Sequence, residues 1–398
     1  MADVTSPAGP PGPGRIFAEF LRLGLTSFGG PVAHLGYFRE AFVRRLGWME
    51  EGVYADLVAL CQFLPGPTSS QVGMGIGYEK AGLGGAVAAF LGFTLPSALV
   101  MAALGLGLAS GIGIDTGVVG GLALVAVAVV AEAVRGMAGS LATTRFTAGL
   151  AVAAAAASLL FPFALTQIGI IALAALIGLA LAPERPAAVS RETPPPGSRR
   201  LGVAALVLFA ALLAALPVLA TQSPVAALAA PFYQAGALVF GGGHVVLPLL
   251  ERGVVGTGMI APESFIAGYG AAQAMPGPLF SLAAFLGATA AMPGPWSGAL
   301  IATLALFAPG FLLVIGALPF WRRLAGFGPA RRALTGVNAA VVGILAAALY
   351  DPVFTTAVHA PRDLAVAILA WGLLAVLRWP AWLVVILGAG AGFARLLS

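Results

Sequence analysis

The sequence predicts an all-α polytopic membrane protein with two homologous halves arranged as an inverted repeat. Three observations lead to this fold class. Hydrophobic residues make up 60% of the chain and charged residues only 9%, whereas a soluble domain carries about 25% charged residues. Apolar segments long enough to cross a bilayer follow one another along the chain. The same short motifs then occur in both halves.

A chain of this composition cannot cover itself with a polar surface, so lipid must solvate it. This excludes soluble enzymes, nucleic-acid-binding proteins and secreted disulfide scaffolds. The single cysteine, Cys61, cannot form an internal disulfide, and the three histidines lie far apart in sequence. We therefore expect the lipid bilayer as a partner, with no nucleic acid, no cofactor and no metal site.

The first 15 residues, MADVTSPAGPPGPGR, are rich in proline and glycine, and we expect a disordered cytoplasmic tail. The first membrane half, copy one, follows at residues 16–182. Its predicted segments are apolar runs close to the length that a transmembrane helix needs. They lie near 16–36, 53–80, 84–108, 117–134, 145–160 and 163–182.

Residues 183–200, PERPAAVSRETPPPGSRR, are too polar to span and are predicted to form a cytoplasmic linker. A connecting transmembrane helix at 201–221 leads to the second half, copy two, at 222–398. Its apolar segments lie near 226–250, 263–291, 296–320, 333–350, 362–377 and 380–397. The chain thus contains about 13 apolar segments, some of them broken or re-entrant.

Three landmarks establish the internal duplication. The motif FGGP at 28–31 recurs as FGGG at 240–243, with an offset of 212 residues. The motif QFLPGP at 62–67 recurs as QAMPGP at 273–278, with an offset of 211. Pro96 then aligns with Pro309 at an offset of 213. A constant order and a nearly constant offset indicate two copies of one unit.

Arginine-rich loops orient the chain, because positive residues accumulate on the cytoplasmic side. Arginines cluster in the 183–200 linker and in the 321–332 loop, which places both in the cytoplasm. An odd number of crossings then separates the two copies, so they face opposite ways. The N-terminus is cytoplasmic and the C-terminus external. The 37–52 loop carries three arginines and conflicts with this topology if the first segment spans, which favours re-entrant hairpins for segments 16–36 and 53–80.

Apolar segments interrupted by glycine and proline at matching repeat positions are typical of the midplane site of a secondary transporter. Proline breaks the helix, and glycine permits the turn and the close approach of a ligand. The half-helix that follows exposes free N–H groups and a partial positive charge, which suits an anion. Packing glycines and ordinary loops are the alternative. The predicted helix breaks are Pro31, Pro65, Pro67, Pro276 and Pro278.

Polar side chains near the breaks are the candidate ligands. Four hydrogen-bond donors follow Pro67, although N-capping explains them equally well. Arg22 is either an anion-binding cation or an interfacial anchor paired with Glu19. The two histidines after the Gly-rich breaks either carry a proton, donate to the anion or pack at the interface. The candidate substrate-binding residues are Arg22, Gly29, Gly30, His34, Gln62, Gly66, Thr68, Ser69, Ser70, Gln71, Gly241, Gly242, His244, Gln273, Gly277 and Ser281.

Longer stretches around these motifs resemble a known family. FGGPVAHLGYFREAFVRRLGWM, LCQFLPGPTSSQVGMGIGYEKAGLGG and FLGFTLPSALVM are similar to the first half of the chromate ion transporter (CHR) family. FGGGHVVLPLLE and QAMPGPLFSLAAFLG resemble its second half. The resemblance runs from about Phe20 to Trp321. It implies a long-chain, two-domain chromate efflux protein with oppositely oriented halves.

The resemblance and the residues together predict a secondary transporter, not an enzyme, in the bacterial inner membrane. A dianion that leaves a cell with a negative interior gains roughly 4.6 kcal/mol per 100 mV. Export of chromate by alternating access therefore needs no ATP site, and the sequence contains no Walker motif. A carrier of sulfate or another oxyanion is the first alternative, and a non-transporting membrane protein is the second. The coupling ion, the direction and the oligomeric state stay open.

Overall fold

A computed structural model of the chain describes residues 11–27, 30–110, 116–161, 166–183, 198–239, 246–290, 293–321 and 328–393. All regular secondary structure in these ranges is helical. Within them, five helices are long and apolar enough to cross a membrane. These are Thr68–Ala109, Gly120–Gly139, Arg199–Leu219, Pro295–Phe320 and Gly328–Ala357. The predicted class of an all-α polytopic membrane protein is therefore confirmed.

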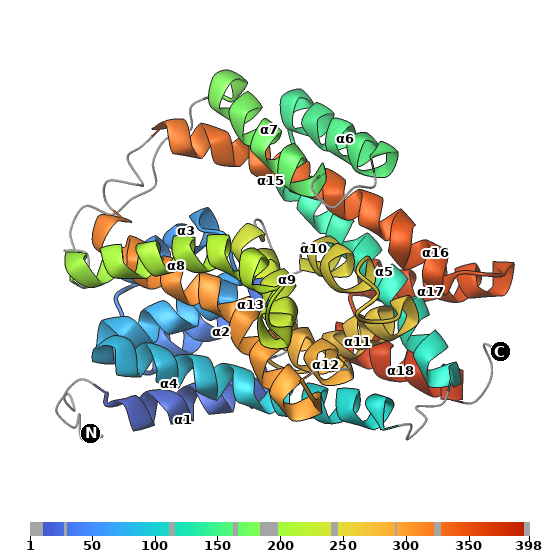
Figure 1. Cartoon of the computed structure of the whole chain (residues 1–398), viewed down its shortest axis with the longest axis horizontal. Helices are drawn as coiled ribbons and strands as arrows, with labels where there is room; N and C mark the ends of the chain where they lie inside the picture. The colour runs from blue at the N-terminus through green and yellow to red at the C-terminus, as the bar shows by residue number, and fades with distance from the viewer. Residues whose placement is uncertain are drawn as a thin grey trace, which may run out of the picture.

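The two halves contain helices in the same order (Figure 1). Copy one comprises α1 (Pro13–Thr26), α2 (Gly30–Phe38), η1 (Arg39–Arg45), α3 (Glu51–Phe63), α4 (Thr68–Ala109), α5 (Thr116–Leu141), α6 (Arg145–Leu160) and α7 (Thr166–Leu181). Helix α8 (Arg199–Leu219) connects the halves. Copy two comprises α9 (Pro224–Leu238), α10 (Val246–Leu250), η3 (Glu251–Val255), α11 (Pro262–Ala274), η4 (Leu279–Ser281), α12 (Leu282–Thr289), α13 (Pro295–Ala317), η5 (Leu318–Phe320), α15 (Gly328–Ala348), η6 (Leu349–Phe354), α16 (Thr355–Ala357), α17 (Pro361–Ala375) and α18 (Ala381–Phe393).

The glycine and proline motifs interrupt the first two segments, as the sequence predicts. Helix α1 ends before the FGGP motif and α2 begins at Gly30, while α3 ends and α4 begins on either side of residues 64–67. The predicted boundary near residue 80 is confirmed. The segments 53–80 and 84–108 meet within α4 at a kink, where the backbone of Ala81 and Gly82 is not helical and separates two helical stretches. Gly82 has a φ of 58°, which lets the chain turn and resume the helix.

Equivalent helices pack in equivalent ways in the two copies. Helix α1 lies on the second part of α4, and α9 lies on α13. A Cβ atom on Gly24 would lie 2.7 Å from the carbonyl oxygen of Phe93, and one on Gly236 would meet the carbonyl oxygen of Leu306. These two pairs occupy matching positions of the repeat. Small residues let helix backbones approach closely in a membrane, where burial of apolar surface does not drive helices together.

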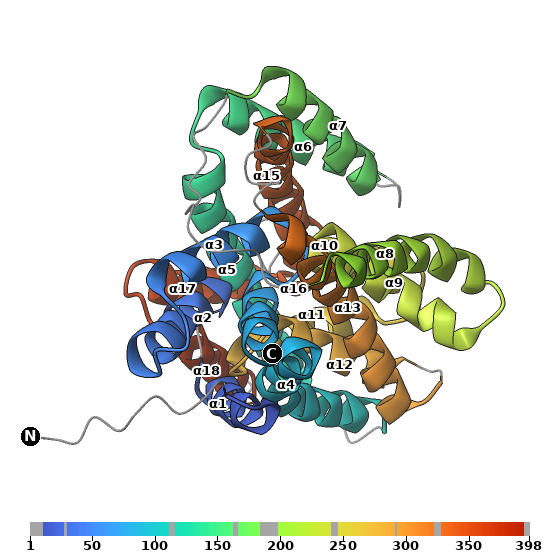
Figure 2. The same cartoon turned by 90° about the vertical axis from the view of Figure 1, so that its left-hand side faces the viewer.

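The last two helices of each copy are exchanged. Helices α6 and α7 pack against α15 of copy two, and α17 and α18 pack against α5 of copy one. Figures 1 and 2 both show α6 and α7 beside α15, far from α18. Backbone contacts of small residues join these helices, with Gly336 against Ala174 and Gly388 against Gly121. Each half therefore completes its fold with helices of the other.

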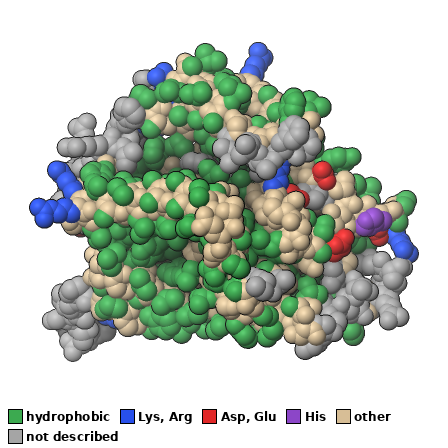
Figure 3. Space-filling view, in the orientation of Figure 1, with side chains coloured by type: hydrophobic (Ala, Val, Ile, Leu, Met, Phe, Trp, Pro, Cys, Tyr) green, Lys and Arg blue, Asp and Glu red, His purple; other side chains and the backbone are tan. Residues whose placement is uncertain are grey.

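The outer surface suits lipid. Large apolar side chains are exposed along α6, α7, α8 and α17, including Leu160, Leu181, Val207 and Leu369. In Figure 3 this face is mostly hydrophobic, and charged side chains are few and lie mainly toward its edges. An exposed apolar surface of this extent needs a hydrocarbon environment.

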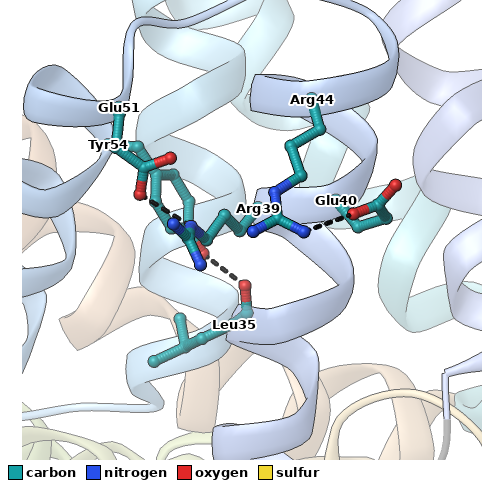
Figure 4. Close-up of polar contacts among 6 residues, drawn as sticks. All are labelled: Leu35, Arg39, Glu40, Arg44, Glu51 and Tyr54. Atoms are coloured by element: carbon teal, nitrogen blue, oxygen red, sulfur yellow. Dashed lines mark hydrogen bonds and ion pairs between the residues drawn. The ribbon is translucent and has the colours of Figure 1, made fainter.

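The arginines of the 37–52 loop all form ion pairs, which the sequence analysis did not foresee. Figure 4 shows two of the pairs, one within η1 and one between η1 and α3, and there Tyr54 also donates a hydrogen bond of 2.6 Å to the Leu35 carbonyl. The pairs are Arg39 with Glu51 at 2.6 Å, Arg44 with Glu40 at 3.4 Å and Arg45 with Glu19 at 2.7 Å. The Glu51 carboxylate raises the pKa of Arg39 above its ordinary value. The partner of Glu19 is thus Arg45 of η1, and not Arg22 of α1 as one alternative of the sequence analysis had it.

We predict that Gly236→Ala destabilises the protein by about 1–3 kcal/mol, because the new methyl group overlaps the backbone of α13. Gly372→Ala is the matched control, since a Cβ atom there meets nothing within 4 Å. Thermal unfolding of the detergent-solubilised protein measures the difference. Equal unfolding temperatures for the two variants would show that α9 does not pack tightly on α13.

Candidate functional site

The two Pro-Gly-Pro loops, residues 65–67 and 276–278, each bind the helix break of the other copy. We call these two contacts the first and the second crossing. The backbone N–H of Gly66 donates a hydrogen bond of 2.7 Å to the carbonyl of Val239, at the end of α9. The N–H of Gly277 donates one of 2.9 Å to the carbonyl of Ser27, at the end of α1. Gly66 and Gly277 are equivalent positions of the repeat, and so are Ser27 and Val239. Each loop is therefore held by the other copy.

Both crossings require glycine. Gly66 has a φ of 128° and Gly277 a φ of 91°, a region that side-chain-bearing residues rarely adopt. There is also no room for a side chain at Gly66, because a Cβ atom there would lie 3.1 Å from the Cα atom of Gly310. A Cβ atom on Gly277 would lie 3.2 Å from the Oγ atom of Ser97, the residue equivalent to Gly310. The two loops thus occupy matching places against α13 and α4.

The polar residues after Pro67 lie at a helix N-terminus without a side-chain cap. Pro67 is the N-cap residue of α4, and no side chain accepts from the first turn. Gln71 makes the first intrahelical bond of the turn, from its N–H to the Pro67 carbonyl at 2.9 Å. The N-capping alternative for Thr68 or Ser69 is therefore not what the structure has. The free N–H groups of the first turn carry the positive end of the helix dipole.

Buried polar side chains gather around this helix start. His34, Ser69, Ser70 and Gln71 are each at most 3% exposed. His34 Nδ1 lies 3.3 Å from Ser69 Oγ, and its ring packs edge-on against Phe93 at 5.1 Å between centroids. Gln71 Nε2 donates to the Pro65 carbonyl at 2.8 Å, which closes the loop onto its own helix. Residues from α2 and α4 thus form one polar group inside an apolar protein.

Many of the buried polar atoms here have no hydrogen-bond partner among the residues that the structure describes. An unpaired buried donor or acceptor costs about 1–3 kcal/mol, so proteins seldom keep several together without a purpose. All the groups are neutral, and most can donate to an oxyanion. The atoms are Ser27 Oγ, His34 Nε2, Ser70 Oγ, Gln71 Oε1, Thr94 Oγ1, Gln273 Nε2 and Ser281 Oγ. We call this set the crossing cluster.

A cavity of about 210 Å³ adjoins the second crossing. Gly30, Gln273 and Gly277 line it together with Glu132 of α5. Arg135 binds both carboxylate oxygens of Glu132, at 2.5 and 2.8 Å. The negative charge that faces this cavity is therefore balanced by a cation on the same helix.

The two copies differ in polarity at equivalent positions. Ser70 of copy one has a counterpart in Ser281, and both hydroxyls are buried. Leu279, Phe280 and Leu282 stand where copy one has Thr68, Ser69 and Gln71. This second start is a short 3₁₀ turn, η4, followed by α12. The polar half-helix N-terminus exists only in copy one.

The remaining predicted residues fall into three groups. Arg22 and Gln62 are exposed, on α1 and at the end of α3, while Thr68 is half-buried. Pro31 lies in the first turn of α2, and Pro65, Pro67, Pro276 and Pro278 flank the crossing glycines. Gly29, Gly241, Gly242 and His244 lie outside the described residues.

The sequence analysis missed Ser27, Thr94, Ser97 and Glu132. Ser27 directly precedes the FGGP motif, and Thr94 and Ser97 flank Pro96 in the block GFTLPS. Hydroxyl side chains next to a break or a helix-internal proline were the available signal. Glu132 offered a weaker one, because its pairing with Arg135 on one helix reads as structural.

A polytopic membrane protein with paired broken helices and a buried cluster of neutral donors has the characteristics of a carrier for a small polar solute. The family model for chromate transporters matches residues 14–179 and again residues 226–393. The chain therefore belongs to the chromate transporter family.

Named relatives agree with this assignment. The chromate transport protein of Pseudomonas aeruginosa is 30% identical over 422 residues, which cover 98% of this chain and 94% of the relative. The probable chromate transport protein of Synechococcus elongatus is 28% identical, with coverage of 84% and 83%. The chromate transport protein of Cupriavidus metallidurans is 27% identical, with coverage of 84% and 81%. No solved structure matches the chain.

We predict that Gly66→Ala abolishes most chromate transport and lowers the unfolding temperature. The substitution strains the backbone at a φ of 128° and places a methyl group 2.7 Å from Gln71 Nε2. Gly47→Ala is the control, because Gly47 also has a positive φ, 59°, but a Cβ atom there meets nothing within 4 Å. Transport and thermal unfolding are measured for both. Similar losses in the two variants would mean that backbone strain alone, and not the crossing, accounts for the effect.

Proposed function

We propose that the protein is a secondary transporter that exports chromate across the bacterial inner membrane, with the crossing cluster as its substrate site. The observation that carries the proposal is the set of buried polar atoms without partners on the elements that form the two crossings, most of which can donate a hydrogen bond. A tetrahedral oxyanion offers four acceptor oxygens and no donor. It is therefore the kind of solute that complements hydroxyl, amide and imidazole N–H groups.

The donors have a consistent chemistry at the start of α4. When the Ser69 hydroxyl donates to His34 Nδ1, the imidazole proton resides on Nε2, which then donates to the anion. Ser70 Oγ and the free N–H groups of the first turn add donors from the same helix end. The positive end of the helix dipole at the start of α4 supplies partial charge without a buried ion.

Alternating access follows from the duplication. We infer that the two copies are oppositely oriented, with a cytoplasmic N-terminus and an external C-terminus, as the arginine-rich loops and the odd number of crossings require. Movement of one copy against the other about the crossings then opens the site to each side in turn. Export of the dianion gains roughly 4.6 kcal/mol per 100 mV from the membrane potential.

Everted membrane vesicles test the proposal. We expect saturable chromate accumulation in energised vesicles that collapses when the membrane potential is removed, and inhibition by excess sulfate to the extent that the site accepts both anions. Absence of accumulation above control vesicles, with the protein confirmed in the membrane, would contradict chromate export. Accumulation of sulfate without chromate would favour the alternative carrier.

We predict that Ser70→Ala and His34→Gln each raise the apparent KM for chromate about ten- to hundredfold. A hydrogen bond to a charged group contributes about 1.5–3 kcal/mol, and each variant removes or displaces one donor. Arg22→Gln is the comparison, because Arg22 is exposed and copy two already has Gln234 at this position. We expect its KM to stay within about twofold of the parent. A large effect of Arg22→Gln with no effect of the other two would move the site from the crossing cluster to α1.

A further inference from the structure

A larger cavity lies between the helices that begin copy two. It measures about 460 Å³ and lies between the end of α8, the helix α9 and the segment α10–η3. The residues that line it change from exposed Pro217 and Thr257 to buried Ala230 and Ala235. The lining therefore combines exposed, half-buried and buried residues of α8, α9 and the α10–η3 segment. The volume of the cavity falls in the range of pockets that hold small ligands.

One residue of the cavity wall lies next to the first crossing in the chain. Leu238 lines the cavity and directly precedes Val239, whose carbonyl accepts the hydrogen bond from Gly66. Gly66 in turn leads through Pro67 into the polar start of α4. The cavity wall and the crossing cluster are thus joined through Leu238, Val239 and Gly66.

Arg252 gives the cavity its charge. Of the described residues that line it, Arg252 alone is charged, and Gln234 and Thr257 add polar groups. Arg252 Nη2 donates to Ser158 on α6, at 3.4 Å to Oγ and 3.5 Å to the carbonyl. The residue also lines a separate cavity of about 200 Å³, in which Glu251 and Asp351 take part. Arg252 therefore lines both cavities, and its guanidinium donates to Ser158, which belongs to the smaller one.

At the equivalent place in copy one, an ion pair joins two elements. Pro231 and Thr257 of the cavity correspond to Glu19 and Arg45, which form an ion pair of 2.7 Å between α1 and η1. Gln234 corresponds to Arg22. Copy one thus joins α1 to η1 with a salt bridge. At the same positions copy two has a proline and a threonine, which line the cavity.

We propose that this cavity is a water-filled vestibule through which a small inorganic oxyanion reaches the crossing cluster, and that Arg252 recruits the anion there. The identity of the anion rests on the proposed function, whereas the vestibule and its preference for anions do not. A cation on the wall of a partly enclosed cavity concentrates anions locally and raises their rate of entry.

Cysteine labelling tests the vestibule without transport. The chain has one cysteine, Cys61, which is fully buried, so the parent protein gives a low background. We expect Gln234→Cys in native membranes to react with both a sulfonate-bearing and a trimethylammonium-bearing methanethiosulfonate reagent. Val207→Cys, on the exposed apolar face of α8, is the lipid-facing control and is expected to stay unreactive. An unreactive Gln234→Cys in folded protein would overturn the vestibule.

The charge of the reagent tests Arg252. In the Gln234→Cys background, Arg252→Gln is expected to lower the ratio of anionic to cationic labelling rates about tenfold at low ionic strength, and Arg252→Lys is expected to preserve the ratio. An unchanged ratio in Arg252→Gln would overturn the recruiting role. Arg252→Lys keeps the test valid if the glutamine variant does not fold, since a ratio that does not fall with added salt in Arg252→Lys contradicts the proposal as well.

Transport then separates this inference from the proposed function. Arg252→Gln is expected to raise the KM for chromate at low ionic strength and to leave kcat within about twofold, because recruitment acts before the anion is bound. Failure of the parent protein to transport chromate, with labelling as expected, would refute the proposed substrate and leave the anion-selective vestibule in place. Normal chromate transport by the parent protein, with an unreactive Gln234→Cys, would refute the vestibule and leave the proposed function in place.

Discussion

The structure depends on a pair of backbone hydrogen bonds that join the two copies. In a Pro-Gly-Pro sequence the glycine is the only residue of the three with an N–H group, and here that single donor is used on the opposite copy. Because Gly66 and Gly277 both have positive φ values, the loops turn sharply and bring their N–H groups to the ends of α9 and α1. The helix breaks are thereby fixed, and the first turn of α4 is left free to bind something other than its own chain.

The exchanged helices add a second connection between the halves. Since α6 and α7 complete copy two and α17 and α18 complete copy one, neither half has its full packing without the other. In lipid, association of helices depends on close packing of small residues, and the contacts of Gly336 and Gly388 are of this kind. The crossings and the exchanged helices are thus two separate connections between the copies.

The sequence analysis anticipated the membrane class, the duplication and the broken helices, because glycine, proline and apolar length act locally. The offset between FGGP and FGGG identifies equivalent positions, but it cannot reveal that each PGP loop contacts the break of the other copy. That pairing is a property of the three-dimensional arrangement. Likewise, the arginines of the 37–52 loop resemble topology signals until their carboxylate partners are placed in space.

The differences between the copies suggest a division of roles after duplication. Copy one has the polar start of α4 and the ion pair of Glu19 and Arg45 between α1 and η1. Copy two has an apolar start at η4 and, at the positions that match this ion pair, a cavity lined by Arg252. A cluster of neutral donors recognises the number and geometry of acceptor oxygens and not the central atom. If the crossing cluster is the substrate site, as we propose, chromate and sulfate, with equal charge and shape, have to be distinguished there by oxyanion size and hydration.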